Sequence, residues 1–486
     1  MAFVLLALLL LGSGNDGDSE ADAALQRFAE LYAAVEREAA ERINPEHVFY
    51  EGAIPGMLRR LDPHSVFMDP GEFEQLKRMQ ESRQKGFGSV VSVLPGRVIV
   101  LQTLPGTPSA KAGLEAGDEI IAINGYRIDR LEFEQLVALL TESRKRRAGL
   151  DVRRPGNARV LQFVLTPEEM QSPSVDRTYF LRAGVGYVRV TSFDLDTGQR
   201  VQEAIEKLGG NKLKALVLDL RDNPGGALPA ALHTASLFLK PGQTILSVRG
   251  RRVTETAEKV PERTVPYEFP LALLIGDRTA SAAEIVAGAL QDNDRATLVG
   301  EPSFGKGLVQ AVYPLSNGAG LALTTSYYFT PSGRSIQRPL KGSQLENTPA
   351  ARESGQEFKS AAGRPLRGGG GIVPDRVVHP AALTPLRTVL SGSGVIVDFA
   401  TEYLRAHPRL SEEFEVSPAL LDEFQVYLSG RNIRPSVAEW SKERPWITHR
   451  LKTEIVTQAF GVARGEEVEA QQDPRILEAL KVLGVE

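Results

Sequence analysis

No cysteine occurs in the chain, and its six histidines are scattered without an HxxxH or HExxH pair. The first absence excludes disulfides, thiol nucleophiles and cysteine–zinc sites, but it does not fix the compartment, because exported proteins can also lack cysteine. The second absence removes the usual histidine-based ligand sets of a catalytic metal. We therefore expect neither a metal site nor a cofactor.

An excess of charge of either sign is also missing. The sequence has 57 Lys and Arg residues against 61 Asp and Glu residues, for a formal net charge of −4. Such a balance gives no general attraction to nucleic acid or to an anionic membrane. The local basic run Ser143–Arg154 favours a solvated helix end and hairpin over a polyanion site. We expect no nucleic-acid partner.

The apolar run at the N-terminus is too short to cross a bilayer. Ala2–Leu11 comprises ten residues, whereas a membrane-spanning helix needs about 20. Its length suits the central region of a signal peptide, although the basic residues that usually precede it are missing. The alternative is a disordered apolar tail. We expect residues 1–20 to be a leader and the protein to be exported, periplasmic or otherwise extracytoplasmic, with membrane association only through an uncleaved leader.

The 486 residues, 42% apolar and 24% charged, suffice for about three globular domains. Ala23–Ile43 has the spacing of an amphipathic helix, and two short helices separated by a DPHS turn follow it. The next stretch alternates strands, turns and two helices, with a hairpin turn at PGR. The expected divisions are a leader at 1–20, a helical N-terminal segment at 21–84, a strand-rich domain at 85–168, an α/β domain at 169–383 and a helical C-terminal extension at 384–486.

The stretch 169–383 alternates apolar strands with helices. ALVLDLR and LALLIGD predict buried strands, and LPAALHTASLFL and SAAEIVAGALQ predict helices. This alternation favours an α/β fold with a largely parallel sheet. Residues 350–370, rich in glycine, serine and charge, predict a mobile loop.

GEPSFGKGL, which starts at Gly300, nearly matches the phosphate-binding loop of nucleotide-binding proteins. That loop requires Ser or Thr after its lysine to bind magnesium, and a helix whose N-terminus faces the phosphates. Gly307 follows Lys306 here, and the next residues, LVQAVYPL, are typical of a strand. Both requirements fail, which argues against a nucleotide-dependent enzyme.

Ser281 is placed where a buried strand turns into a helix of small residues. In isolation TASAAE favours an N-cap serine, but a hydroxyl there also lies near the positive end of the helix. A nucleophilic hydroxyl needs a base, and no histidine lies near these turns in the sequence. Lys306 can serve if desolvation lowers its pKa, because only about one free lysine in 2500 is neutral at pH 7. On a strand, Gln310 would share its face and hold its amine.

Acyl transfer also requires donors for the oxyanion. The turn DLRDNPGG (Asp219–Gly226) follows a buried strand, and its glycines can present backbone N–H groups without steric cost. The N–H of Ala282 would be a second donor. A simple turn is the alternative for this segment.

Seven motifs occur in order between Asn44 and His379: GAIPGMLRRLDPHS, AGLEAGDEIIAING, DLRDNPGG, TASAAEIVAGAL, GEPSFGKGLVQ, TPSGRSIQ and GGGGIVPD. Together they resemble the C-terminal processing, or tail-specific, proteases, a family of Ser/Lys serine peptidases. The resemblance implies a multidomain α/β (α+β) chain in which a PDZ domain is inserted between the helical N-terminal segment and the α/β protease core. It further implies Ser281 as nucleophile, Lys306 as general base and Gln310 as the residue that positions this lysine.

Other residues receive roles from the same resemblance. Gly225, Gly226 and Ala282 are implied as the oxyanion hole, and Glu284 matches an acidic residue of the serine motif whose role is less clear. Ser303 stands where the family often has threonine.

The PDZ domain is implied to capture the C-terminus of a substrate. The loop KGFGSV would bind the terminal carboxylate, through Gly86, Phe87, Gly88 and Ser89, while an extended peptide adds a strand beside it. The expected partners are thus protein or peptide substrates with free C-termini. Whether copies of the chain form a homo-oligomer stays open, as does the role of the C-terminal extension in dimerisation, gating or capping of the core.

The prediction is a serine endopeptidase that cleaves near the C-termini of unfolded or tailed proteins. The alternative is a catalytically inactive PDZ scaffold that binds protein C-termini. The joint presence of Ser281, Lys306 and Gln310 favours the peptidase.

Overall fold

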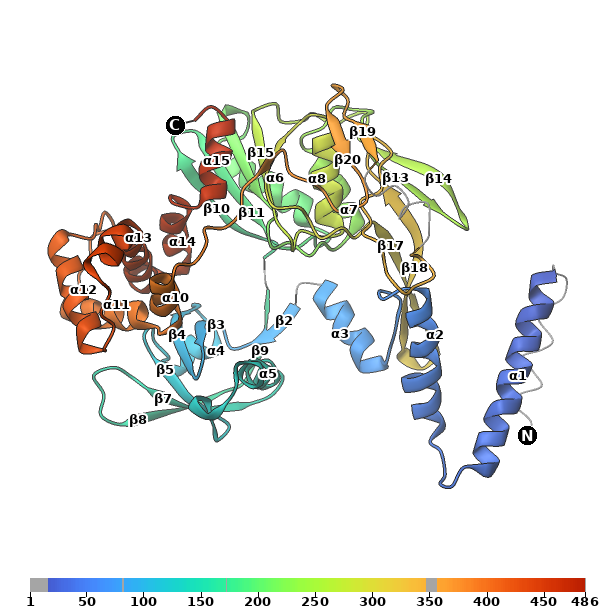
Figure 1. Ribbon diagram of the computed structural model, residues 1–486, viewed down its shortest axis with the longest axis horizontal. Coiled ribbons are helices and arrows are strands. Elements are labelled where there is room, and N and C mark those ends of the chain that lie inside the picture. The colour runs from blue at the N-terminus through green and yellow to red at the C-terminus, as the bar shows by residue number, and fades with distance from the viewer. Residues whose placement is uncertain (1–15, 81–82, 172, 347–355, 486) are drawn as a thin grey trace.

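The computed structural model describes residues 16–80, 83–171, 173–346 and 356–485. Along the chain it comprises N-terminal helices, a small strand-rich domain, a larger sheet with flanking helices, and C-terminal helices (Figure 1). Residues 1–15 of the predicted leader lie outside these ranges. None of the helices within them combines the length and apolar character that a membrane span requires.

The N-terminal segment is helical, as predicted, and also carries one short strand. Helix α1 ends at Glu38, earlier than expected, and packs Phe28 and Tyr32 against Phe49. The predicted DPHS turn lies between α2 and β1, with α3 beyond. The elements are α1 (Asp16–Glu38), η1 (His47–Ala53), α2 (Ile54–Leu61), β1 (Val66–Met68) and α3 (Pro70–Gln80).

The strand-rich domain has its own apolar core and a sheet of order β3-β4-β5-β7-β8, with β6 paired to β5. Strand β3 lies at an edge of this sheet, so one side of it is open to a further strand. The chain enters and leaves through the antiparallel ribbon β2–β9. The elements are β2 (Arg83–Gly86), β3 (Ser89–Leu94), β4 (Arg97–Thr103), α4 (Pro108–Ala112), β5 (Glu119–Ile123), β6 (Tyr126–Arg127), η2 (Ile128–Arg130), α5 (Phe133–Ser143), β7 (Ala148–Arg153), β8 (Val160–Leu165) and β9 (Glu168–Gln171).

The larger sheet has the order β10-β11-β12-β15-β16-β21, and all its strand pairs are parallel except β10–β11. Strands β12 and β15 are buried along their whole length, as strands covered on both faces must be. The elements are β10 (Val175–Arg182), β11 (Val185–Val190), α6 (Thr197–Lys207), η3 (Gly210–Lys212), β12 (Ala215–Asp219), α7 (Leu228–Ser236), β15 (Leu271–Ile275), α8 (Ala282–Asp292), β16 (Thr297–Gly300) and β21 (Arg376–Val377).

A second sheet, of order β1-β18-β13-β14 with β17 paired to β18, lies beside this core (Figure 1). The sequence pattern of LVQAVYPL predicted β17, whereas the hairpin β13–β14 was not predicted. The reason is visible in β14, whose side chains are exposed on nearly every position and therefore lack apolar alternation. The elements are β13 (Thr244–Gly250), β14 (Val253–Lys259), β17 (Leu308–Pro314), η4 (Ser316–Gly318) and β18 (Gly320–Phe329).

The prediction of a mobile loop at residues 350–370 is partly wrong. Residues 350–355 lie outside the described ranges, but β19 (Glu357–Lys359) and β20 (Pro365–Arg367) pair as a short hairpin. This hairpin is held on the core by Arg364, which contacts Asp294 and Asp375.

The C-terminal extension consists of helices, as predicted. Several begin with a capping residue followed by proline, such as Thr384–Pro385 and Ser417–Pro418, a combination that favours helix starts. The first four helices share an apolar core, and α15 packs on the face of the large sheet opposite α6, α7 and α8. The helices are α10 (Pro385–Gly392), α11 (Val395–Ala406), α12 (Pro418–Gly430), α13 (Val437–Phe460), α14 (Val462–Ala470) and α15 (Pro474–Val482).

Candidate active site

Ser281 and the glycine turn meet because they follow adjacent parallel strands. The turn 220–227 comes after β12, and residues 276–281 come after β15, at the carboxyl edge of the sheet. Ligand sites of parallel sheets form at this edge. A methyl group placed on Gly225 would lie 2.8 Å from Cβ of Ser281 and 2.9 Å from the backbone nitrogen of Ala282. Residues distant in sequence are therefore in direct contact here.

Ser281 has a strained backbone. It is the N-cap of α8 with φ 54° and ψ −117°, a conformation that non-glycine residues rarely adopt and that costs of order 1–3 kcal/mol. Thr279 holds the turn, since its hydroxyl donates to Leu220 O at 2.7 Å and accepts from Gly276 N–H at 2.9 Å. The strain is thus imposed by well-anchored neighbours and is a feature of a serine set at a sharp strand-to-helix turn.

Glu284 connects the serine turn to the lysine loop. Its buried carboxylate accepts from Ser281 N–H and Lys306 N–H, each at 2.9 Å, and from Gly305 N–H at 2.7 Å and Ser303 O–H at 2.5 Å. Burial raises the pKa of Glu284, and the four donors oppose that rise. The residue whose role was unclear from sequence therefore sets the distance between Ser281 and Lys306.

Lys306 is half-buried, and its Nζ donates to Oε1 of Gln310 at 2.8 Å. Burial lowers the pKa of Lys306, while the negative charges of Asp62 and Glu284 oppose the change. The sequence placed both residues on one strand, but Lys306 precedes β17, and the strand has an irregular register at Gln310. The two side chains nevertheless meet. In the described part of the chain no hydrogen bond joins Ser281 Oγ to Lys306 Nζ.

The glycine turn offers fewer free donors than predicted. The N–H of Gly225 donates to Oδ1 of Asn223 at 2.8 Å, whereas among described residues the N–H of Gly226 has no acceptor. Ala282 is the first residue of α8, so its N–H has no acceptor within the helix. The N–H groups of Gly226 and Ala282 are therefore the remaining candidates for an oxyanion hole, and Gly225 provides close approach.

Two contacts of the site were not predicted from the sequence. The carbonyl oxygen of His64 accepts from Nε2 of Gln310, so the DPHS turn reaches the site although no histidine is near it in sequence. The hydroxyl of buried Tyr328 donates to Lys306 O at 2.7 Å and lies 3.2 Å from Ser281 O. The DPHS motif was the available signal for the first contact, and the second had none.

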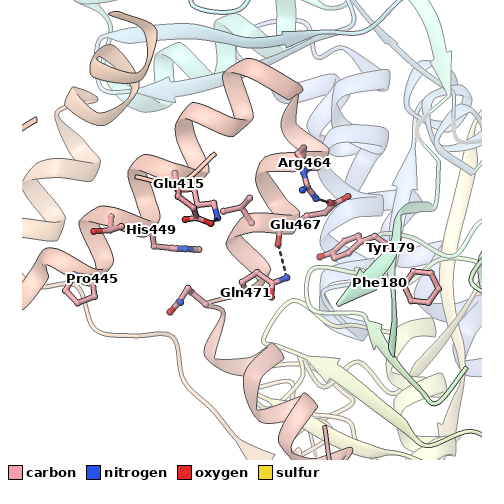
Figure 2. A pocket seen from close by; sticks show the side chains of 12 residues that line it. Tyr179, Phe180, Glu415, Pro445, His449, Arg464, Glu467 and Gln471 are labelled. Atoms are coloured by element: carbon pink, nitrogen blue, oxygen red, sulfur yellow. Dashed lines mark hydrogen bonds and ion pairs between the residues drawn. The ribbon is translucent and has the colours of Figure 1, made fainter. Parts of the chain in front are cut away.

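The predicted carboxylate loop borders a cavity of the strand-rich domain. Gly86, Phe87, Gly88 and Ser89 line this cavity of about 650 Å³ together with the edge strand β3 and the end of α5. The first turn of α14 also lines it. A second cavity of about 440 Å³ lies between α13, α14 and β10 (Figure 2). It contains none of the predicted site residues.

Comparison with known proteins identifies the family. The model of "Peptidase family S41" matches residues 184–342, and a "PDZ domain" model matches residues 99–154. A carboxy-terminal-processing protease of Bartonella bacilliformis is 37% identical over 320 residues, which are 64% of this chain and 72% of that protein. Carboxyl-terminal-processing peptidase 2, chloroplastic, of Arabidopsis thaliana is 34% identical over 318 residues, 62% of this chain and 61% of that protein.

Among solved structures, the photosystem II D1 C-terminal processing protease aligns with 75% of this chain and 93% of its own, at 26% identity and a TM-score of 0.42. The fold prediction of a protease core with a PDZ domain and helices at both ends is confirmed. By its similarity to the Bartonella protein, the chain belongs to the carboxy-terminal-processing proteases of peptidase family S41.

Proposed function

We propose that the chain is a serine endopeptidase in which Ser281 is the nucleophile, Lys306 the general base and Gln310 the residue that positions the lysine. One observation carries the proposal: Lys306 is half-buried with its amine on Gln310, and Glu284 binds the backbones of both Lys306 and Ser281. Structural lysines are usually exposed. A half-buried lysine linked to a strained serine is better explained by chemistry than by stability.

The proposed reaction starts with attack of Ser281 Oγ on the peptide carbonyl carbon. The neutral amine of Lys306 takes the hydroxyl proton, and the ammonium then gives a proton to the departing amine. The N–H groups of Gly226 and Ala282 donate to the oxyanion. The peptide C–N bond breaks, and the acyl group remains on Ser281 as an ester. Water then attacks the ester carbonyl while the lysine takes a proton from the water and gives it to Ser281 Oγ, so that the C–O bond to serine breaks and the new carboxyl terminus leaves.

The base must be neutral, and the environment of Lys306 supports this. Burial lowers its pKa, which increases the neutral fraction at pH 7. Its hydrogen bond with Gln310 is present without a bond to Ser281. Catalytic hydrogen bonds are often long in unliganded enzymes and tighten when substrate binds.

The proposed substrate is a protein with an accessible C-terminal tail. Strand β3 is an edge strand, so an extended tail can pair with its backbone. The loop Gly86–Ser89 at the start of this strand would then face the terminal carboxylate. Two related proteins are named for processing carboxyl termini, in agreement with this substrate class.

We also propose that the protein is exported, which is supported by the apolar run Ala2–Leu11. Sequencing the N-terminus of protein isolated from its native cells tests this point, and a mature chain that still begins at Met1 would speak against cleavage of the leader.

The test of the peptidase is cleavage of an unfolded protein with a free apolar C-terminus, followed by mass spectrometry without ATP or added metal. Ser281→Ala and Lys306→Ala should each lower kcat/KM by about 10³-fold or more. Lys240→Ala removes an exposed lysine and serves as the matched control.

Circular dichroism confirms that each variant is folded. If Lys306→Ala cleaves the substrate as fast as the wild type, Lys306 is not the base. An absence of cleavage by the wild type would favour the PDZ scaffold.

A further inference from the structure

The turn Asp62–Ser65 is built around a buried carboxylate. Asp62 is 1% exposed, and its Oδ1 accepts from His64 N–H at 2.8 Å and Ser65 N–H at 2.9 Å. Its Oδ2 accepts from the hydroxyl of Ser65 at 2.6 Å. An aspartate that binds the backbone two and three residues later fixes a turn. Pro63, with its restricted φ, further limits the alternatives.

This turn is attached to the strand pair that carries Gln310. The hydroxyl of Ser65 accepts from the N–H of Thr324 at 3.1 Å, and Thr324 is the register partner of Gln310 across β17 and β18. The register between β17 and β18 shifts between Val309 and Gln310. Such a bulge leaves a backbone group without its ladder partner, and Ser65 supplies the missing acceptor.

The same turn determines which way the Gln310 amide faces. Nε2 of Gln310 donates to the carbonyl oxygen of His64, and Oε1 accepts from Lys306 Nζ. An amide group can be rotated to exchange its oxygen and nitrogen, but the rotated form would place two oxygens against each other at His64. The carbonyl therefore keeps an acceptor toward Lys306. A neutral amine that donates one hydrogen to this acceptor has its lone pair pointing elsewhere.

From these contacts we infer that Asp62–Ser65 is a positioning turn: through the His64 carbonyl and Gln310 it orients the amine of Lys306 toward Ser281. The inference rests on the proposed function of Ser281 and Lys306. The contact between His64 and Gln310 joins the N-terminal segment to a strand 246 residues further along the chain.

Among the described residues, Asp62, Glu284 and His64 interact with the charge of Lys306, and the hydroxyl of Tyr328 contacts its backbone carbonyl. Asp62 and Glu284 raise the pKa of Lys306 by their charge, and His64 carries a half-buried imidazole whose own pKa is lowered by burial and by Lys306. Loss of the Asp62 charge should therefore lower the pKa of Lys306. The rise of kcat/KM on the acid side of its pH profile (the acid limb) reports the pKa of the base in the free enzyme. This acid limb should then move to lower pH.

The test compares Asp62→Asn and Ser65→Ala with wild type. Both should lower kcat about 10- to 100-fold, because the amine is no longer held in line with Ser281, and KM should stay within about twofold. Asp62→Asn should also move the acid limb to lower pH, whereas Ser65→Ala keeps the charge and should leave the limb in place. A merely structural role would lower the melting temperature but leave the kcat of the folded enzyme unchanged.

Asp69→Asn is the matched control. Asp69 is an exposed aspartate of the same segment that accepts from Glu72 N–H at 2.9 Å, and its variant should keep wild-type kcat. A kcat for Asp62→Asn within twofold of wild type would overturn the inference.

If Asp62→Asn does not fold, an unchanged kcat for Ser65→Ala would overturn it equally. Ser281→Ala separates this result from the proposed function. If that variant is still active, the serine mechanism is wrong. If it is inactive while the turn variants behave as wild type, only the positioning role is wrong.

Discussion

At Ser281 the backbone is held at φ 54°, and at Lys306 an ammonium-forming side chain is half-buried. Both arrangements cost free energy of folding. The costs are tolerated because the neighbours are rigid: Thr279 anchors the serine turn, and Glu284 receives four hydrogen bonds. A stability experiment can therefore detect what activity alone cannot, namely whether Lys306 is strained in the folded protein.

Lys306→Met should abolish cleavage and raise the melting temperature at pH 7, because methionine fills similar space without a charge to desolvate. The pKa of Lys306 is lower in the folded protein than its unfolded value of about 10.4. The unfolded chain thus binds more protons between these two values, and wild-type stability rises with pH through that window. The advantage of Lys306→Met should shrink as the pH rises.

Calorimetry between pH 7 and 10 measures this difference, with exposed Lys240→Met as the control. A lower melting temperature for Lys306→Met at every pH would show that the lysine stabilises the fold.

Helix α8 and the loop 303–306 are joined through the single side chain of Glu284. Its position three residues after the N-cap is one that sequence rules recognise as a capping box. Those rules explain the bond to Ser281 N–H. They do not reveal the three donors from the loop, because that contact depends on the sheet between the two segments.

Glu284→Gln should destabilise the protein and stop cleavage. The amide nitrogen cannot accept, so two of the four donors lose their acceptor, at about 1.5–3 kcal/mol for each hydrogen bond to a charged group. The expected loss is roughly 3–6 kcal/mol in the free energy of unfolding, measured in urea. Glu258→Gln changes an exposed glutamate on β14 and should have almost no effect. Wild-type stability of Glu284→Gln would contradict the linking role.

The order of most elements was predictable, because buried strands such as β12 and β15 are continuous apolar runs and the helices have clear periodicity. The polar hairpin β13–β14 was not predictable, since strands that pair without being buried show no apolar alternation in the sequence. The motifs predicted Ser281, Lys306 and Gln310 as site residues, and the structure places Lys306 against Gln310 and joins the backbones of Ser281 and Lys306 through Glu284. The contact of the DPHS turn with Gln310 was not predicted, because this contact depends on the register of β17 and β18.

On the scale of the whole molecule, the strand-rich domain is held to the rest of the protein by a strand ribbon and by hydrogen bonds to the C-terminal helices. The ribbon β2–β9 connects it to the core, Arg97 binds Asp398 of α11 with bonds of 2.9 and 3.1 Å, and Gln102 accepts from Val462 N–H of α14 at 2.9 Å. The C-terminal helices therefore hold this domain as well as covering the core sheet. The proposed divisions near residues 85 and 168 fall at the ribbon.

The ribbon makes a clean excision of the PDZ domain practicable. Gly86 and Glu168 are register partners in β2 and β9, so their backbones are separated by about one strand spacing, 4.7–4.9 Å. Replacing residues 87–167 by Asn-Gly, which favours a two-residue hairpin turn, should leave the protease core folded. If the PDZ domain recognises the C-terminus of the substrate, the deletion variant should still cleave. Its cleavage should no longer depend on a free C-terminus.

The measurement is kcat/KM for matched peptides with a free or an amidated C-terminus. Wild type should prefer the free carboxylate by about tenfold or more, since one charge-assisted contact is worth roughly 1.5–3 kcal/mol, while the deletant should show a ratio near one. Ser281→Ala in the deletant excludes a contaminating protease. A deletant that still prefers the free carboxylate would place tail recognition in the core, and an inactive but folded deletant would make the PDZ domain an activator of the site.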